Sequence, residues 1–271
     1  MSAAVSESTR PVHVARADEQ ELFLLSHRMQ APLLLLGPSG CGKTQLVEAM
    51  AERLGRPLIT VTCHDDLVTA DLVGRYLMRV GDVVWRDGPL VTAMRRGALC
   101  YLDEIVEARS DTLAVLHAVA DHRRALRIDP LDEEVQAAPG FQLVASYNPR
   151  PVGSPKELRT PLRQRFVTVH IDYLAAADEQ RVVSDRSGVD RATAADLVAV
   201  AATLRHASGK DQQGRFDAPS TRAIVLAAGL VVQGASVRQA VDACLIAPLT
   251  SDTAVAGALR ELASATLPPV R

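Results

Sequence analysis

The chain has 271 residues, of which 48% are apolar and 3% aromatic, and its formal net charge is -2. This length and apolar content suit one large globular domain or a medium domain with a smaller one. A near-neutral chain provides no basic field for nucleic acid or anionic lipid, and so few rings leave little to stack on bases. The composition therefore weighs against a nucleic-acid-binding or membrane-surface protein.

The four cysteines (Cys41, Cys63, Cys100 and Cys244) are scattered, with no CxxC pair. We interpret them as reduced thiols, as is typical of a cytoplasmic protein. Cys63 stands next to His64, but no further Cys or His lies at metal-ligand spacing. The first residues are polar, and no apolar run approaches the roughly 20 residues that cross a bilayer. We expect a cytoplasmic protein without a membrane span.

The strongest local pattern is a phosphate-binding loop at residues 37–44. A glycine, four free positions and then Gly-Lys-Thr follow an apolar strand pattern and precede a helical one. Such a turn aims backbone N–H groups and the positive helix end at one point, which suits a chain of phosphates. We expect Lys43 to reach the outer phosphates and the Thr44 hydroxyl to bind Mg²⁺. The residues expected to bind ATP here are Gly37, Pro38, Ser39, Gly40, Cys41, Gly42, Lys43 and Thr44.

Strand and helix patterns alternate up to about residue 174, starting with a helical pattern at 18–29 that has Leu22, Leu25 and Met29 on one face. This alternation predicts an α/β fold with a parallel sheet covered on both faces. The expected core strands are 33–36, 58–62, 98–102, 141–146 and 166–171.

Beyond residue 174 the strand patterns vanish and Ala-rich helical patterns take over. These expected helices are 175–187, 192–207, 220–232, 236–247 and 253–265, with a polar loop at 209–214. We therefore predict a flexible N-terminus (1–14), an α/β nucleotide-binding domain (15–174) and a helical lid subdomain (175–271).

Two hairpins are expected within the α/β domain. The first, at 73–85 around Gly81, interrupts what would otherwise be one helix resuming at 89–96, and the second lies at 125–136. The first hairpin carries Trp85, the only tryptophan of the chain. Both an interaction role and a packing role for this side chain remain open, since buried and interface tryptophans are both common.

Polar residues follow two of the expected core strands. Asp103 and Glu104 end one strand, where one carboxylate can hold hydrated Mg²⁺ and the next can orient the attacking water. Asn148 ends another, where its amide can hydrogen-bond the γ-phosphate or that water. A turn asparagine before proline is the alternative interpretation of Asn148.

Candidate functional arginines lie in two further segments. A helix expected at 156–165 carries Arg159, Arg163 and Arg165 and leads into the last core strand. Arg222 follows a good N-cap, against the helix dipole, which suggests a compensating anion. An arginine bent into solvent explains Arg222 equally well.

Taken together, these motifs occur in the order of an AAA+ ATPase. Over residues 15–265 the chain resembles the MoxR branch, and within it the CbbQ/NirQ/NorQ/GvpN group. The runs that carry this likeness are 62–66, 71–76, 87–90, 101–109 and 146–149.

The resemblance implies a role for each polar residue. Asp103 corresponds to the Mg²⁺ ligand, Glu104 to the water-orienting residue and Asn148 to the sensor-1 residue. Arg222 corresponds to the sensor-2 arginine, which contacts ATP. Arg165 corresponds to the finger that reaches a neighbouring subunit's ATP, with Arg163 in reserve.

The resemblance also implies partners. Family members form rings, usually hexamers, and work with a protein carrying a von Willebrand factor A domain. Their clients are proteins such as Rubisco, nitric oxide reductase or gas vesicles. The two hairpins correspond to the helix-2 insert and the pre-sensor-1 hairpin, whereas the proline-rich run 151–155 departs from the family pattern.

We therefore expect an ATP-hydrolysing ring ATPase that remodels or activates a protein client. The alternatives are a nucleic-acid-handling ATPase, which shares the helix-2 insert, and a small-molecule kinase. Salt-sensitive DNA binding would favour the first alternative, and behaviour as a monomer or dimer would favour the second.

Overall fold

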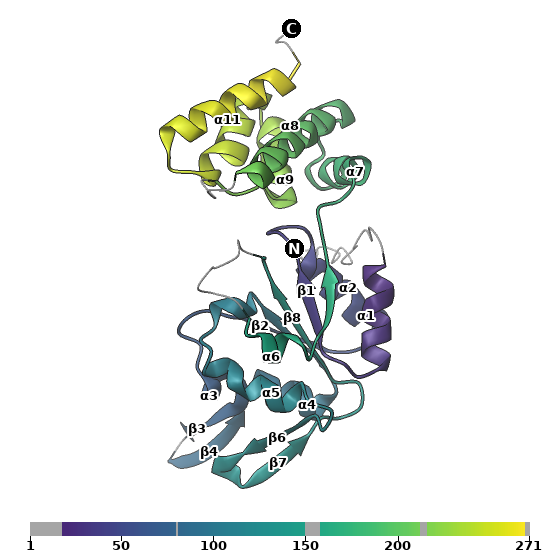
Figure 1. Cartoon of the computed structure of the whole chain (residues 1–271), viewed down its shortest axis with the longest axis vertical. Helices are drawn as coiled ribbons and strands as arrows, with labels where there is room; N and C mark the ends of the chain where they lie inside the picture. Colours follow the sequence, from purple (N-terminus) through teal and green to yellow (C-terminus); the bar gives the residue numbers. More distant parts are fainter. Residues whose placement is uncertain (1–17, 80, 150–157, 212–215, 269–271) are drawn as a thin grey trace, which may run out of the picture. The chain divides into compact units, whose positions relative to one another are not determined.

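The computed structural model describes residues 18–79, 81–149, 158–211 and 216–268 (Figure 1). The chain divides into two compact units, one comprising residues 1–37 and 42–171 and the other residues 38–41 and 172–271. The expected flexible terminus (1–14) and the proline-rich run 151–155 lie outside the described residues.

The first unit is built around a five-stranded parallel sheet in the order β2-β5-β8-β1-β9. Its strands are β1 (Leu33–Leu36), β2 (Leu58–Thr62), β5 (Leu99–Asp103), β8 (Gln142–Tyr147) and β9 (Val167–His170). β1 and β8 are buried along their whole length, as apolar strands covered on both faces must be. The predicted α/β fold with a parallel sheet is confirmed.

Within the described residues, three helices of at least two turns pack on this sheet: α1 (Glu19–Arg28) on β9, α2 (Lys43–Leu54) on β5, and α4 (Pro89–Arg96) on β2 and β5. Gly55 ends α2 with a left-handed backbone. Figure 1 shows α1 and α2 beside β1.

Helix α1 buries a different face from the one expected. Leu25 and Met29 are 42% and 72% exposed, whereas Phe23 and Ser26 are buried. The Ser26 hydroxyl donates to the Phe23 carbonyl and accepts from the buried Gln142 amide of β8 at 2.9 Å. The apolar spacing was misleading because this buried polar partner selects the serine side of the helix.

The two predicted hairpins are confirmed. The first, β3 (Gly74–Arg79) with β4 (Asp82–Asp87), lies between α3 (Thr69–Val73) and α4; the second pairs β6 (Ala125–Ile128) with β7 (Glu133–Gln136). The Tyr76 hydroxyl donates to the Pro130 carbonyl at 2.9 Å and so ties the first hairpin to the second. The Trp85 ring meets the Tyr76 ring edge-on at 5.2 Å and packs against the core, so Trp85 anchors the hairpin.

Short helical segments connect the remaining elements. They are the 3₁₀ turns Ile105–Glu107, Thr112–Val115 and Asp129–Leu131, and the helices α5 (Leu116–Val119) and α6 (Thr160–Arg163). α6 is shorter than the predicted helix at 156–165, because Pro161 has no N–H and restricts the helix to begin next to it. Residues 156 and 157 lie outside the described chain.

The second unit contains five α-helices within its described residues and has its own apolar core. They are α7 (Ala176–Ser187), α8 (Arg191–Lys210), α9 (Thr221–Val232), α10 (Val237–Val241) and α11 (Thr253–Thr266). The predicted helix at 236–247 is wrong in its second half, where the π-helix Asp242–Ile246 and the 3₁₀ turn Ala247–Leu249 follow α10, and Pro248 cannot continue an α-helix. Gly209 and Lys210 of the expected polar loop belong to α8, and residues 212–214 lie outside the described chain.

Candidate functional site

The phosphate loop follows β1 and opens α2, as predicted. Its turn needs glycine, because Gly40 and Gly42 have φ of +69° and +101°, where other residues are strained. The positive end of α2 and the loop N–H groups therefore lie at the carboxyl edge of the sheet.

Lys43 joins two of the predicted site residues. Its ammonium donates to the Gly37 carbonyl at 2.6 Å and to the Asn148 amide oxygen at 2.7 Å. Lys43 is only 7% exposed, and a buried cation requires hydrogen-bond acceptors such as these two oxygens. The end of β8 is thus held against the phosphate loop.

A second cluster places Thr44 and Asp103 around one hydroxyl. The Tyr101 hydroxyl donates to a carboxylate oxygen of Asp103 at 2.8 Å and lies 3.4 Å from the Thr44 hydroxyl. The Ser146 hydroxyl donates to the same Asp103 oxygen at 2.6 Å. Burial raises the pKa of Tyr101 above its usual range, which keeps the phenol protonated. This set of hydroxyl and carboxylate oxygens is of the hard kind that Mg²⁺ prefers.

Tyr101 and Ser146 were missed as site residues by the sequence analysis. Both lie in strands made mostly of apolar residues. Two signals were nevertheless present: Tyr101 stands two positions before Asp103, on the same face of β5, and Ser146 is a hydroxyl within an otherwise apolar part of β8.

Glu104 follows Asp103 with a left-handed backbone, at a φ of +57°. This conformation costs a residue with a side chain about 1 kcal/mol or more. Its N–H donates to the Ser146 hydroxyl at 3.4 Å, and its side chain is half-buried. At Glu104 the backbone therefore leaves the extended direction of β5, which ends at Asp103. Backbone strain of this kind is typical of functional sites.

Cys63 lies beside this turn, and its N–H donates to the Asp103 carbonyl at 2.9 Å. Burial, with the nearby Asp103 and Glu104 carboxylates, raises the pKa of the Cys63 thiol to about 12. All four cysteines are free and buried, as expected of reduced thiols. Within the described residues no three His, Cys, Asp or Glu side chains gather as a metal cluster, and His64 is exposed.

The candidate finger residues lie on the surface of the first unit. Arg165 follows α6 and donates to the Pro161 carbonyl at 2.5 Å, whereas Arg163 ends the helix. Both side chains are exposed. They do not join the Lys43 or Asp103 clusters described above.

Arg222 is exposed in the first turn of α9, in the second unit. The Ser220 hydroxyl caps this helix by accepting from the Ala223 N–H at 3.2 Å. The helix therefore begins where the sequence predicts, with the arginine directed to the surface.

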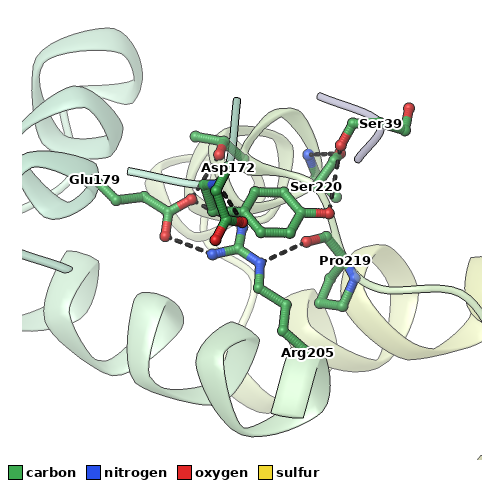
Figure 2. A network of polar contacts seen from close by, with 9 residues as sticks. Ser39, Asp172, Glu179, Arg205, Pro219 and Ser220 are labelled. Carbon is green, nitrogen blue, oxygen red and sulfur yellow. Dashed lines mark hydrogen bonds and ion pairs between the residues drawn. The ribbon is translucent and has the colours of Figure 1, made fainter. Parts of the chain in front are cut away.

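A buried polar network holds the start of α9 (Figure 2). Arg205 of α8 forms a bidentate ion pair with Glu179 of α7, at 2.7 and 2.8 Å, and Glu179 is only 1% exposed. The Arg205 guanidinium also donates to the Pro219 carbonyl at 2.9 Å, and the Thr221 hydroxyl donates to Glu179 at 2.6 Å. Both residues flanking the Ser220 cap are thereby fixed.

Tyr173 extends this network to the tip of the phosphate loop, which belongs to the second unit. The Arg205 guanidinium stacks 3.6 Å from the centre of the Tyr173 ring, and the Tyr173 hydroxyl donates to the Ser39 carbonyl at 3.4 Å. A Cβ at Gly40 would lie 2.5 Å from the Ser220 Cβ. Gly40 is therefore required for its φ and for this close approach.

These features define a class of protein. A phosphate loop between β1 and α2, carboxylates at the end of β5, an asparagine after β8 and a following helical unit are the arrangement of an AAA+ P-loop ATPase. Residues 32–166 match the family described as AAA domain (dynein-related subfamily), and residues 179–266 match the family described as CbbQ/NirQ/NorQ C-terminal.

Similar proteins extend over most of the chain. It is 48% identical to Protein NorQ of Paracoccus denitrificans, covering 94% of this chain and 93% of the relative. It is 46% identical to Protein CbbQ of Hydrogenophilus thermoluteolus, covering 94% of each. The chain belongs to the CbbQ/NirQ/NorQ family of MoxR-type AAA+ proteins.

Two further comparisons agree. Denitrification regulatory protein NirQ of Stutzerimonas stutzeri is 44% identical, over 93% of this chain and 90% of the relative. A mutant of RuvB from Thermotoga maritima has a TM-score of 0.55 at 15% identity, covering 92% of this chain and 71% of RuvB, and so shares the fold. No helix among the described residues has the length and apolar content to cross a membrane.

Proposed function

We propose that this protein hydrolyses ATP and uses the cycle to activate or remodel a protein client. The observation that carries the proposal is the convergence of two clusters at the carboxyl edge of one sheet. Lys43 joins the phosphate loop to Asn148, and Tyr101 joins Thr44 to Asp103, with Glu104 next in the chain. In open α/β sheets ligands bind at this edge.

Each residue of the site has a role that its chemistry supports. The Lys43 ammonium binds the outer phosphates. The Asn148 amide, which accepts a hydrogen bond from Lys43, acts on the γ-phosphate or the attacking water. Thr44 and Asp103 supply the hydroxyl and carboxylate oxygens for Mg²⁺, which when bound neutralises phosphate charge. Glu104 orients and polarises the attacking water.

Two arginines complete the proposed site from other elements. Arg222, on the surface of α9, contacts the phosphates as the sensor-2 residue. Arg165 acts on the ATP of a neighbouring subunit, with Arg163 as the second candidate. Both finger candidates are exposed on the first unit, as a residue acting across a subunit boundary must be.

The similar proteins also support a proposal about the client. Similarity to the proteins named NorQ, CbbQ and NirQ supports the proposal that this client is an enzyme complex such as nitric oxide reductase or Rubisco. We further propose a cytoplasmic hexameric ring that works with a partner carrying a von Willebrand factor A domain. The exposed Met78 (83%) and Val83 (63%) on the first hairpin support a protein contact there, because exposed apolar patches often mark interfaces.

The hydrolytic site is tested by separating ATP binding from turnover. Glu104→Gln should bind MgATP as the parent does and hydrolyse it about 10²-fold more slowly or worse, as expected for loss of a general base. Lys43→Ala should lose binding itself. Nucleotide affinity and phosphate release, measured separately, distinguish the two.

Glu134→Gln is the matched control, since Glu134 is an exposed glutamate of β7 outside both clusters. It should behave as the parent. Hydrolysis at the parental rate by Glu104→Gln would remove Glu104 from the proposed role.

A further inference from the structure

The first hairpin covers a cavity of about 400 Å³. This cavity lies on the face of the hairpin that carries Arg75, Leu77 and Arg86, with α3, β2 and the start of α4 completing its lining. The opposite face carries Tyr76 and Trp85, which anchor the hairpin to the core and to the second hairpin. The pocket is therefore built on an anchored element.

Backbone segments approach each other closely at two glycines beside this cavity. A Cβ at Gly88 would lie 2.4 Å from the Leu72 carbonyl oxygen, and one at Gly74 would lie 2.6 Å from the Arg86 carbonyl oxygen. Both glycines line the cavity, and neither position could carry a side chain without moving the backbone. Apolar groups of Ile59, Leu77 and Pro89 provide much of the remaining wall.

The charges in the cavity are unevenly matched. Arg75 and Arg86 stand directly opposite each other in the β3–β4 ladder, a placement that is destabilising for like charges. Arg75 pairs with Asp71 at 3.1 Å. Asp87 already accepts from Arg95 at 2.9 Å and from the Trp85 indole at 2.8 Å.

Arg86 is the cation of the cavity that has no counter-charge among the described residues. Its exposed guanidinium makes no hydrogen bond or ion pair with any of them. The cavity thus has one uncompensated cation beside apolar walls. A guanidinium of this kind matches a carboxylate, with which it can form two parallel hydrogen bonds.

We propose that this pocket binds a segment of a partner protein that combines a carboxylate with apolar side chains, and that Arg86 pairs with the carboxylate. The proposal rests on the proposed function, because it adds to the contact at Met78 and Val83 a second partner contact on the opposite face of the same hairpin. The cavity volume falls within the roughly 300–1,000 Å³ typical of ligand pockets. Val84, 42% exposed on the same face, offers further apolar area to such a segment.

A nucleic-acid ligand fits the pocket less well. Asp71 and Asp87 are paired with Arg75 and Arg95, so among the described residues that line the cavity only Arg86 is left to bind an anion, too few cations for the successive phosphates of a nucleic-acid backbone. The net charge of -2 provides no general attraction for a polyanion. The mixed charge and apolar walls favour a single carboxylate on a peptide.

The test uses an array of overlapping 15-residue peptides from the proteins encoded beside this one, probed with the full chain and MgATP. Bound peptides should be those with Asp or Glu next to apolar residues. The strongest of them is then titrated by fluorescence anisotropy against the parent, Arg86→Glu and Arg96→Glu. Arg86→Glu should weaken binding at least about tenfold, as expected for loss of a charge-assisted pair.

Arg96→Glu is the matched control, because Arg96 is an exposed arginine of α4 that does not line the cavity. It makes the same charge change and should leave the affinity unchanged. The inference is overturned if no acidic peptide binds, if Arg86→Glu binds equally well, or if Arg96→Glu weakens binding as much. A single-stranded DNA that competes for the Arg86 site would also overturn it.

The parent's ATP hydrolysis is measured alongside. An inactive parent that still binds the peptide through Arg86 contradicts the proposed function and leaves the pocket in place. If the parent hydrolyses ATP but Arg86→Glu does not weaken peptide binding, only the pocket proposal is contradicted.

Discussion

At the level of single residues, the Tyr101 hydroxyl links the two oxygens expected to hold Mg²⁺. It donates to Asp103 and lies beside Thr44. Its removal leaves both ligands in place without the group that orients them, and outer-shell partners of this kind often contribute about 10–100-fold to metal affinity. We therefore expect Tyr101→Phe to raise the Mg²⁺ concentration needed for half-maximal ATP hydrolysis by about tenfold.

Tyr147→Phe is the control for this substitution. Tyr147 is a buried tyrosine at the end of β8 whose hydroxyl makes no hydrogen bond within the described residues. A Mg²⁺ titration of the ATPase should separate the two variants. If both titrate as the parent does, Tyr101 has no part in the metal site.

The thiol of Cys63 gives a prediction about pH. Because its pKa is raised to about 12, the thiolate form is disfavoured until pH approaches that value. At pH 8, roughly one thiol in 10⁴ is ionised, far fewer than for a thiol of ordinary pKa near 8.5. We expect iodoacetamide at pH 8 to leave Cys63 unmodified in the native protein and to label it once urea unfolds the chain.

Peptide mass mapping reads out this labelling directly. Labelling of native Cys63 as fast as in urea would show that its burial beside Asp103 and Glu104 is wrong. Within the native chain, the labelled fraction should rise as pH is raised, since the ionised fraction rises with it.

Some residues of the candidate site could be predicted from the sequence, and others could not. Lys43, Asp103 and Asn148 could be predicted, because a glycine turn or a strand end gives them a position. The roles of Tyr101 and Ser146 were not visible, because a hydroxyl in an apolar strand is indistinguishable from a core residue without the strand order. The left-handed backbone of Glu104 is also a tertiary effect that its residue type disfavours.

At the level of elements, the network around Arg205 is a device for positioning the start of α9. Its guanidinium donates to Glu179 and Pro219 from one plane of fixed donors and stacks its face on the Tyr173 ring, which a lysine cannot reproduce. Removing one partner of a buried ion pair typically costs about 3–5 kcal/mol. Arg205→Met should therefore destabilise the chain by an amount of this order in urea unfolding.

Arg205→Lys keeps the charge and tests position more finely. If the network acts through Arg222, this variant and Arg222→Ala should each raise the KM for ATP, and the double variant should be no worse than Arg222→Ala alone. If the effects of the two substitutions on the KM for ATP were fully additive, Arg205 would not act through Arg222 and its role would be in stability alone. An unchanged KM in Arg222→Ala would instead remove Arg222 from the ATP site.

Elements were predictable where their pattern was local. The hairpins and core strands follow from turn residues and apolar runs. The buried face of α1 was not predictable, because Gln142, far away in sequence, decides it through Ser26. The shortened α6 and the π-helix after α10 both lie next to prolines, whose effect on helix length depends on the surrounding contacts.

At the level of the whole molecule, we propose that each ATPase site is shared between two subunits of a ring. The sheet positions the phosphate loop, Asp103, Glu104 and Asn148 within one chain, whereas Arg163 and Arg165 project from its surface. An arginine acting on a neighbour's ATP stabilises charge on the transferring phosphoryl group and contributes about 10³–10⁵ in rate in nucleotide hydrolases. Arg165→Ala should bind ATP and hydrolyse it barely or not at all.

The most direct test of this composite site is a mixing experiment. Glu104→Gln subunits keep the finger and lose the water-orienting carboxylate, whereas Arg165→Ala subunits keep that carboxylate and lose the finger. If the two are co-assembled, some interfaces receive both intact parts, so the ATPase rate should rise above that of either variant alone. Subunit exchange is verified independently by energy transfer between labelled subunits. If subunits exchange and no activity returns, or if Arg165→Ala alone is fully active, then Arg165 does not act across a subunit boundary.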